Sequence, residues 1–341
     1  MGRIVTFGEI MLRLSPDGYD RFFQNDRIQA TFGGAEANVA VSLANFDEQV
    51  SFVTKIPSHA IGQGAVRALR SFGVDTSLIS YGGNRIGVYY LEKGACQRGS
   101  VCIYDRAGSA FAEAAESDFD WDVIFRGCDW FHFTGITPAL SPNTTQICEN
   151  ACLAAKERKI TVSCDLNYRA KLWSEETARK TMTRLCRSVD ICIANEEDAE
   201  RVFGLRSDKT DVNTGKLNKA GYEEVAAGLI RQFGFRAVAF TLRGSHSATV
   251  NDWSGMLFDS RECWYSRDYH LDHIVDRVGG GDSFGAGLIY ALRHAYSPQR
   301  AVEFAAAASA LKHSIEGDFN RVTVAEVERL ASGTGSGRVQ R

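Results

Sequence analysis

The sequence predicts an α/β fold in which a mostly parallel sheet is covered by helices on both faces and a small β-sheet forms a lid. Two observations predict the main sheet. Short apolar runs alternate with longer helical patterns, and residues 191–194 are continuously apolar. Strands that alternate with helices form right-handed βαβ units, and a strand buried on both faces reads as an unbroken apolar run. A third observation predicts the lid: residues 11–32 and 84–106 break this rhythm with strand-like alternation.

The elements follow in chain order. The predicted strands of the main sheet are 3–7, 50–55, 130–134, 161–165, 191–194 and 237–242. The predicted helices are 36–46, 62–72, 144–158, 175–188, 222–233, 283–295 and 298–313. One domain is therefore expected over residues 1–330, followed by a flexible Gly- and Ser-rich tail over 331–341. The alternative for 11–32 and 84–106 is that they are edge strands of the main sheet.

Composition excludes several function classes. A formal net charge of -3 over 341 residues gives no basic excess for nucleic acid or an acidic membrane surface. The chain shows no long apolar run that could cross a membrane, and its first ten residues do not resemble a signal peptide. Nine cysteines without a Cys-x-x-Cys motif fit reduced thiols, several of them buried. We therefore expect a cytoplasmic protein that binds neither nucleic acid nor membranes.

A glycine-rich turn, Gly279-Gly280-Gly281-Asp282, leads into the helical pattern that follows. Glycines let backbone N–H groups approach an anion, and the start of a helix adds partial positive charge, so the turn suits a phosphate. The spacing fits neither a Walker A loop nor Gly-x-Gly-x-x-Gly. Asp282 has two interpretations: a helix N-cap, or a base that accepts a proton from an alcohol beside the phosphate it attacks.

Two separated motifs resemble those of the ribokinase-like (PfkB) carbohydrate kinases. The family pattern Asp-Thr-Thr-Gly-Ala-Gly-Asp appears as Asp276-Arg-Val-Gly-Gly-Gly-Asp282, and Gly-Gly-x-x-x-Asn-x-Ala appears as Gly33-Gly-Ala-Glu-Ala-Asn-Val-Ala40. The resemblance implies a Rossmann-like domain with a β-sheet lid, ATP and Mg²⁺ as cofactors, and a homodimer or higher homo-oligomer. It implies Asp282 as catalytic base and the amides of Gly279, Gly280 and Gly281 as an anion hole.

The resemblance also implies the residues that contact each substrate. The expected sugar-binding residues are Gly33, Gly34, Asn38, Tyr89, Tyr104, Arg106, Ile136, Arg169 and Asp282. The expected ATP-binding residues are Asn167, Asn195, Thr241, Arg243, Gly244, Gly279 and Gly281. Asn195 and Asp198 match the element that holds Mg²⁺ through water, with Asp198 in place of the usual Glu. Simpler interpretations stay open: an ordinary turn at Gly33-Gly34, a solvated acidic helix start at Asp198, and a surface arginine at Arg243.

Within the family, several stretches are most similar to kinases of 2-keto-3-deoxygluconate, such as residues 8–16, 104–110, 165–169 and 311–320. That acceptor carries a carboxylate, which a guanidinium binds with paired hydrogen bonds. Arg106 and Arg169 are the expected clamp, with Tyr89 and Tyr104 packed on the sugar chain. The alternatives are lid packing for the tyrosines and a structural Asp as the partner of Arg169.

The predicted reaction is ATP-dependent phosphorylation of the terminal hydroxyl, which gives 2-keto-3-deoxy-6-phosphogluconate. Fructose, ribose and 5-dehydro-2-deoxygluconate are alternative acceptors, because relatives that act on them share parts of the pattern. Two alternatives belong to other classes: a Rossmann-type oxidoreductase, disfavoured by the missing Gly-x-Gly-x-x-Gly, and a non-catalytic sugar-binding protein on the same fold.

Overall fold

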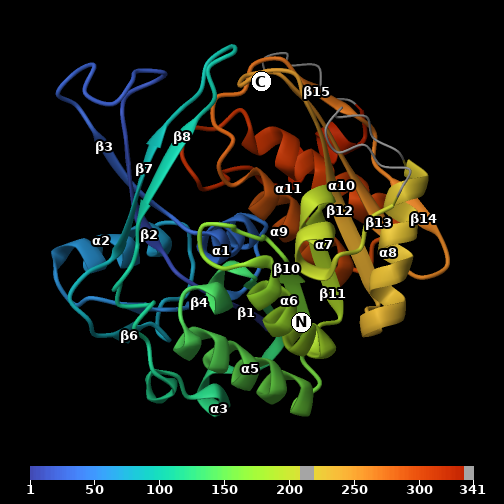
Figure 1. Ribbon diagram of the computed structural model, residues 1–341, viewed down its shortest axis with the longest axis horizontal. Helices are drawn as coiled ribbons and strands as arrows, with labels where there is room; N and C mark the ends of the chain where they lie inside the picture. Colours follow the sequence, from blue (N-terminus) through green and yellow to red (C-terminus); the bar gives the residue numbers. More distant parts are fainter. Residues whose placement is uncertain (208–218, 334–341) are drawn as a thin grey trace.

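Two large sheets and a third sheet of two short strands make up the β-structure of the computed structural model, which describes residues 1–207 and 219–333 (Figure 1). The larger sheet has nine strands, of which β15 pairs only with β13. Its strands run, in spatial order, β14 (Cys263–Tyr265), β13 (Asn251–Phe258), β12 (Ala237–Ser245), β11 (Ile191–Asn195), β10 (Thr161–Asp165), β9 (Cys128–Thr134), β1 (Arg3–Phe7) and β4 (Val50–Val53), with β15 at Tyr269–Leu271.

The large sheet is parallel from β12 to β4 and antiparallel at its other edge. Strands β11 and β12 pair in parallel, whereas β13 is antiparallel to β12, β14 and β15. The α/β fold with a mostly parallel sheet is therefore confirmed. The antiparallel hairpins at 251–271 were not predicted, because no helical pattern separates them and their turns resemble loops.

A second sheet of four strands stands apart from the first. It consists of β3 (Gln29–Gly33), β2 (Met11–Ser15), β7 (Gly87–Glu92) and β8 (Val101–Asp105). The four strands lie in the two segments whose alternation breaks the α/β rhythm, except that β3 extends one residue further, to Gly33. They do not pair with the main sheet, so the edge-strand alternative is wrong. A third sheet has two short strands, β5 (Lys55–Ile56) and β6 (Ser80–Tyr81), which fall between β3 and β7 in the sequence.

Helices pack on both faces of the main sheet, and alternate strand residues point to each. On one face, Ile191 and Ile193 contact a core shared by α1 (Ala35–Asn45), α2 (Ala60–Arg70), α9 (Gly280–Arg293), α10 (Pro298–Lys312) and α11 (Val324–Ala331). On the other, Cys192 and Ala194 contact a core shared by α3 (Trp121–Ile124), α5 (Pro142–Glu157), α6 (Glu175–Leu185), α7 (Glu196–Phe203) and α8 (Lys219–Phe233). The short elements α4 (Ile136–Ala139), η1 (Glu116–Asp118) and η2 (Cys186–Ser188) complete the described helices.

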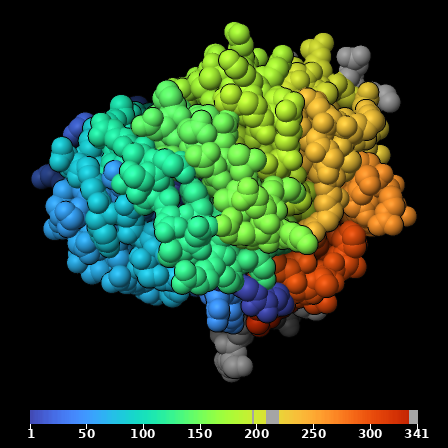
Figure 2. Space-filling model, turned by 90° about the horizontal axis from the view of Figure 1, so that it is seen from below, coloured from blue at the N-terminus to red at the C-terminus, as the bar shows by residue number. Residues whose placement is uncertain are grey.

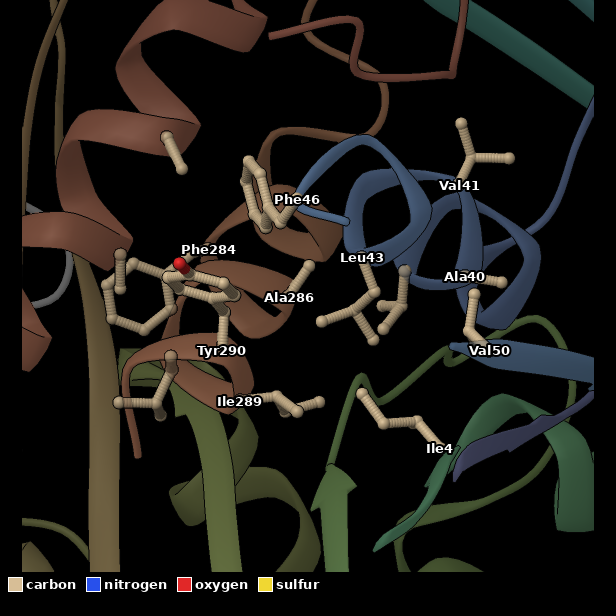
Figure 3. Packing of buried hydrophobic residues seen from close by; sticks show 14 of the residues in the cluster. Ile4, Ala40, Val41, Leu43, Phe46, Val50, Phe284, Ala286, Ile289 and Tyr290 are labelled. Atoms are coloured by element: carbon tan, nitrogen blue, oxygen red, sulfur yellow. The ribbon is translucent and has the colours of Figure 1, made fainter. Parts of the chain in front are cut away.

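The first of these cores fixes the helix that follows the glycine-rich turn. Figure 3 shows Leu43 of α1, and Phe46 just after this helix, on the side of Ile289 and Tyr290 of α9. The Phe46 and Tyr290 rings meet edge to face, with centroids 5.5 Å apart. Aromatic pairs of this kind add to the stabilisation from buried apolar area. Phe284 and Ala286, near the start of α9, belong to the same core, so this end of the helix is also held by apolar packing.

The remaining predictions about the chain have mixed outcomes. The last described helix runs through Ala331, one residue beyond the predicted domain end, and residues 334–341 of the expected tail lie outside the described part. All nine cysteines are free, and five of them are buried. Within residues 1–207 and 219–333, no helix has the length and apolar character needed to cross a membrane. Figure 2 shows the N-terminal part of the chain, blue to teal, on one side and the antiparallel edge, orange, on the other.

Candidate active site

A cavity of about 400 Å³ lies where the lid sheet faces the main sheet. Residues that follow the carboxyl ends of parallel strands form its floor, among them Glu9 after β1, Ile136 after β9 and Asn167 after β10. Open α/β sheets bind ligands at this edge because their loops converge there. Tyr89 and Tyr104 of the lid line the same cavity.

Most of the predicted site residues meet in this cavity. The predicted residues that line it are Gly34, Asn38, Tyr89, Tyr104, Arg106, Ile136, Asn167, Arg169, Asn195, Asp198, Thr241, Arg243, Gly279, Gly280, Gly281 and Asp282. Gly33 and Gly244 are not among the lining residues. These side chains come from segments that span residues 34 to 282, so their convergence is a property of the fold and not of local sequence.

The glycine-rich turn adopts a conformation that needs glycine. Gly279 has φ +83°, and a Cβ there would lie 2.1 Å from the carbonyl oxygen of Asp318. Helix α9 begins at Gly280, so Asp282 is already inside its first turn and is not the N-cap. The N-cap alternative for Asp282 is therefore wrong. Nothing lies within 4 Å of a Cβ built on Gly281, so the backbone at the helix start faces open space in the cavity.

The carboxylate of Asp282 is oriented by a side chain from α1. The Asn38 Nδ2 group donates a hydrogen bond of 2.6 Å to Asp282 Oδ2, while Asn38 Oδ1 accepts one from the Gly34 amide. Burial raises the pKa of Asp282 to about 7, against the effect of the Asn38 hydrogen bond, which lowers it. A carboxylate with this pKa is a competent proton acceptor near neutral pH.

The carboxylates of Asp165, Asp198 and Asp282 lie close enough in the cavity to affect one another's charge. Burial raises the pKa of Asp165 well above its usual value, and the charges of Asp198 and Asp282 raise it further. Burial likewise raises the pKa of Asp198 to about 6. Like charges held together out of water favour a cation between them or protonation. The nearby Arg169 lowers the pKa of all three carboxylates.

Asp198 is buried, so it is not part of a solvated acidic helix start. Its carboxylate accepts hydrogen bonds from the Tyr168 and Asn195 amides, at 2.9 and 3.1 Å. Asn195 Oδ1 in turn accepts from the amides of Glu197 and Asp198, which completes a capping box. Both side chains therefore help to begin α7 at the cavity wall.

The carboxylates of Asp165 and Asp198 suit a magnesium ion that is also bound by phosphates and water. No group of three or more acidic, His or Cys side chains could enclose a metal ion among the residues that the structure describes. Mg²⁺ prefers oxygen ligands, keeps several waters, and commonly uses one or two carboxylates together with substrate phosphates. Asp165 and Asp198 provide such carboxylates at the cavity. The donor set fits a magnesium ion held through phosphates and water.

Two arginines face the cavity from the lid side and from the main sheet. Arg106 is buried, and its Nε and Nη2 groups donate to Glu9 Oε2, the first at 2.8 Å. Arg169 is exposed and its Nη1 donates to the Tyr168 carbonyl at 3.3 Å. Arg169 forms no ion pair with any carboxylate in residues 1–207 or 219–333, so the alternative of a structural Asp partner is not what the structure shows.

The two lid tyrosines form a cross-strand pair. Tyr89 on β7 is opposite Tyr104 on β8, and their ring centroids lie 5.9 Å apart. Tyr89 is buried and its hydroxyl donates to Asp318 Oδ1 at 2.5 Å, whereas Tyr104 is 43% exposed. Tyr89 therefore has a packing role, as the simpler interpretation expected, and it also lines the cavity together with Tyr104.

Sequence reasoning missed several residues at the cavity. Glu9, Asp165, Arg277 and Asp318 all line it. Arg277 donates to the carbonyls of Ser247 and Ala248. Glu9, Asp165 and Asp318 stand inside stretches that matched the family, so their position beside the predicted residues was the available signal. What a single sequence could not show is that Asp318 approaches the glycine-rich turn from a distant loop.

Comparisons with known proteins agree with this geometry. The model of the pfkB family carbohydrate kinases matches residues 1–320. A crystal structure of 2-dehydro-3-deoxygluconokinase from Thermotoga maritima is 50% identical, with a TM-score of 0.94 over 98% of this chain and 100% of that one. The 2-dehydro-3-deoxygalactonokinase of Haloferax volcanii is 31% identical over 98% of both chains, and the 2-dehydro-3-deoxygluconokinase of Thermoproteus tenax is 27% identical over 92% of this chain and 89% of its own. A family match of this extent, with the motif residues gathered in one cavity, leads to one conclusion: the chain belongs to the pfkB family of carbohydrate kinases.

Proposed function

We propose that this kinase transfers the γ-phosphoryl group of ATP to the terminal hydroxyl of 2-dehydro-3-deoxygluconate, which is another name for 2-keto-3-deoxygluconate. The observation that carries the proposal is the placement of Asp282 at the start of α9, inside a cavity with arginines and tyrosines opposite. The 50% identity to the Thermotoga maritima enzyme supports this acceptor.

Asp282 is the proposed general base. Its carboxylate takes the proton of the terminal hydroxyl as the hydroxyl oxygen forms a bond to the γ-phosphorus. The bond between that phosphorus and the β–γ bridging oxygen breaks, and ADP leaves with the electron pair. General bases contribute about 10²- to 10⁴-fold to such reactions. The hydrogen bond from Asn38 holds the carboxylate toward the acceptor.

The backbone at Gly279, Gly280 and Gly281 is the proposed anion hole. Its amides stand at the N-terminus of α9, where partial positive charge favours the negative charge that spreads over the transferring group. Mg²⁺ held through water by Asn195 and Asp198, with Asp165 beside them, would neutralise phosphate charge when ATP is bound. Asn167, Asn195, Thr241, Arg243 and Gly244 are proposed to contact the nucleotide side.

Arg106 and Arg169 are proposed to hold the carboxylate of the sugar acid. Glu9 already neutralises Arg106 and fixes its orientation, which leaves Nη1 for the acceptor. The Arg169 guanidinium is exposed, and within residues 1–207 and 219–333 it donates to the Tyr168 carbonyl and forms no ion pair. Hydrogen bonds between a guanidinium and a carboxylate are charge-assisted and directional. The carboxylate of a sugar acid could form an ion pair with Arg169 that a neutral sugar cannot form, so the arrangement favours an acid.

A second acceptor is supported by one specific observation. The Haloferax volcanii relative, 31% identical over 98% of both chains, is named for 2-dehydro-3-deoxygalactonate. The two acids differ only in the configuration at one hydroxyl-bearing carbon, and a single hydroxyl contact can decide between them.

The test is a coupled assay of ADP release. It compares both 2-dehydro-3-deoxy acids with fructose, ribose and 5-dehydro-2-deoxygluconate. We expect the highest kcat/KM with 2-dehydro-3-deoxygluconate, and a phosphate ester on its terminal carbon by NMR. A higher kcat/KM with a neutral sugar would reject the acid clamp, and a higher value with the galactonate epimer would support the second acceptor.

A further inference from the structure

A buried arginine of the lid is joined to the loop that carries the anion hole. Arg13 lies on β2, and its side chain is only 1% exposed. Its Nη2 group donates to Asp276 Oδ2 at 2.6 Å, and its Nη1 group donates to Asp318 Oδ1 at 2.9 Å. Asp276 and Asp318 are themselves buried and belong to different loops of the main domain. One guanidinium therefore connects the lid sheet to two loops.

Asp276 links Arg13 to the residue just before the glycine-rich turn. Its Oδ1 atom accepts a hydrogen bond of 3.0 Å from the Val278 amide, and its Oδ2 atom accepts one of 3.1 Å from the Gly317 amide. Val278 immediately precedes Gly279 and packs against the small apolar cluster of Met11, Tyr89 and Leu91 in the lid. The approach to the anion hole is thus fixed from the lid side by both charge and packing.

Asp318 links Arg13 to Tyr89, which lines the cavity on the lid side. Its Oδ1 atom accepts from the Tyr89 hydroxyl as well as from Arg13, and its carbonyl oxygen stands against Gly279. A chain of contacts therefore runs from Tyr89 through Asp318 and Arg13 to Asp276, and from there to Val278. The whole path is buried except at Val278, so solvent screens its charges weakly.

We propose that Arg13 is a positioning residue: through Asp276 and Asp318 it couples the position of the lid sheet to the position of the backbone amides that form the anion hole. Arg13 is not among the residues that line the cavity, and it acts through Asp276 and Asp318. A planar guanidinium can bridge two carboxylates from fixed directions, whereas the ammonium of lysine is a point charge that cannot reproduce this geometry. The inference rests on the proposed function in one respect, the role of the turn at Gly279 to Asp282 as an anion hole.

The critical variant is Arg13→Lys, which keeps the buried positive charge and removes the fork. Its matched control is Arg293→Lys. Arg293 is also buried and also bridges two carboxylates, Glu48 and Asp129, but it lies at the far end of α9 from the turn. Both variants are assayed with whichever acceptor the wild type phosphorylates fastest, so a wrong acceptor assignment leaves the test intact. ATP affinity is measured separately by calorimetry.

We expect Arg13→Lys to lower kcat by about tenfold to a hundredfold while the Kd for ATP stays within about twofold of wild type. Arg293→Lys is expected to leave both within about twofold. Equal kcat values for the two variants would overturn the proposal. So would a parallel loss of kcat and ATP affinity in Arg13→Lys, because it would indicate general disruption of the site. If Arg13→Lys does not fold, the charge-balanced pair Arg13→Gln with Asp276→Asn is judged by the same two quantities.

Discussion

The main sheet and the lid sheet are stabilised in different ways. The main sheet lies between two large apolar cores, and α9, which follows the glycine-rich turn, is part of one of them. The lid has an apolar cluster of only three buried residues, Met11, Tyr89 and Leu91. Leu12 and Phe32 of the lid also pack against the main core, and buried ion pairs such as Arg106 with Glu9 add polar contacts.

This difference suits the two tasks of a kinase. The base and anion hole need a fixed geometry, which apolar packing provides because cores resist deformation. A lid has to open for substrates and close against water, and polar contacts can be exchanged for water at small net cost. The comparison predicts that substitutions in the core around α9 cost more folding stability than those in the apolar cluster of the lid, and that substitutions at the glycine-rich turn have the largest effect on kcat.

The largest effect is expected from Gly279→Ala. A Cβ at this position would meet the Asp318 carbonyl oxygen at 2.1 Å, and φ is +83°. We expect kcat to fall by about a hundredfold or more as the anion hole is displaced. Gly234→Ala is the matched control, since Gly234 also has positive φ, +73°, but nothing lies within 4 Å of its Cβ. Near-normal kcat in purified, folded Gly279→Ala would contradict the role of the turn.

The apolar core of the main domain and the apolar cluster of the lid are compared directly by truncating one leucine in each to alanine. Leu288 of α9 is fully buried in the main core, and Leu91 of β7 is 4% exposed in the lid cluster. Chemical denaturation should show a loss of about 3–5 kcal/mol in unfolding free energy for Leu288→Ala and about 2 kcal/mol for Leu91→Ala. A larger loss for Leu91→Ala would reject the distinction between the sheets.

Arg169→Ala tests the acid clamp. Loss of a hydrogen bond to a charged group costs about 1.5–3 kcal/mol, so KM for the sugar acid should rise by about tenfold to a hundredfold. The KM for a neutral sugar should change little. Arg201→Ala serves as the control, because Arg201 is an exposed arginine of α7 that pairs with Glu175 outside the cavity. Equal KM changes for acid and neutral acceptors would argue against a carboxylate contact.

A smaller effect is expected from Asn38→Ala, and it should appear mainly in the pH profile. In the wild type, kcat/KM should fall as the pH drops below about 7, because protonated Asp282 cannot accept a proton. The Asn38 hydrogen bond lowers the pKa of Asp282, so its removal should move the midpoint to higher pH. Asn45→Ala on the same helix is the control, since Asn45 contacts the Asn320 carbonyl instead. An unchanged midpoint in Asn38→Ala would show that Asn38 does not affect the protonation of the catalytic base.

Local sequence was sufficient to predict the parallel strands and most helices. The β10 strand at Thr161–Asp165 matches its predicted range, because an apolar run between a helical pattern and a polar segment has one good interpretation. The hairpins at 251–271 were missed because short antiparallel strands without intervening helices lack that contrast. Helix α9 begins at Gly280 and not at Ser283, since glycines are poor helix formers by propensity and packing in the core overrides it.

The candidate site was predicted where motifs mark it and missed where only the fold creates it. Asp282, Asn38 and the glycines are marked by spacing, and they do meet in one cavity. The pairing of Arg106 with Glu9 and of Arg13 with Asp276 joins residues about a hundred or more positions apart, which no local pattern encodes. Such ion pairs depend on how the lid and the main sheet are placed relative to each other.

The most direct test of the central claim is turnover and thermal stability of Asp282→Asn at about pH 8. We predict a fall in kcat of about 10²-fold or more, because an amide cannot accept the hydroxyl proton. The folded-state pKa of Asp282 is raised by burial, so its ionised form weakens the fold as pH rises through about 7. The melting temperature of Asp282→Asn should therefore equal or exceed that of the wild type. A folded Asp282→Asn protein with kcat within about twofold of wild type would contradict the account.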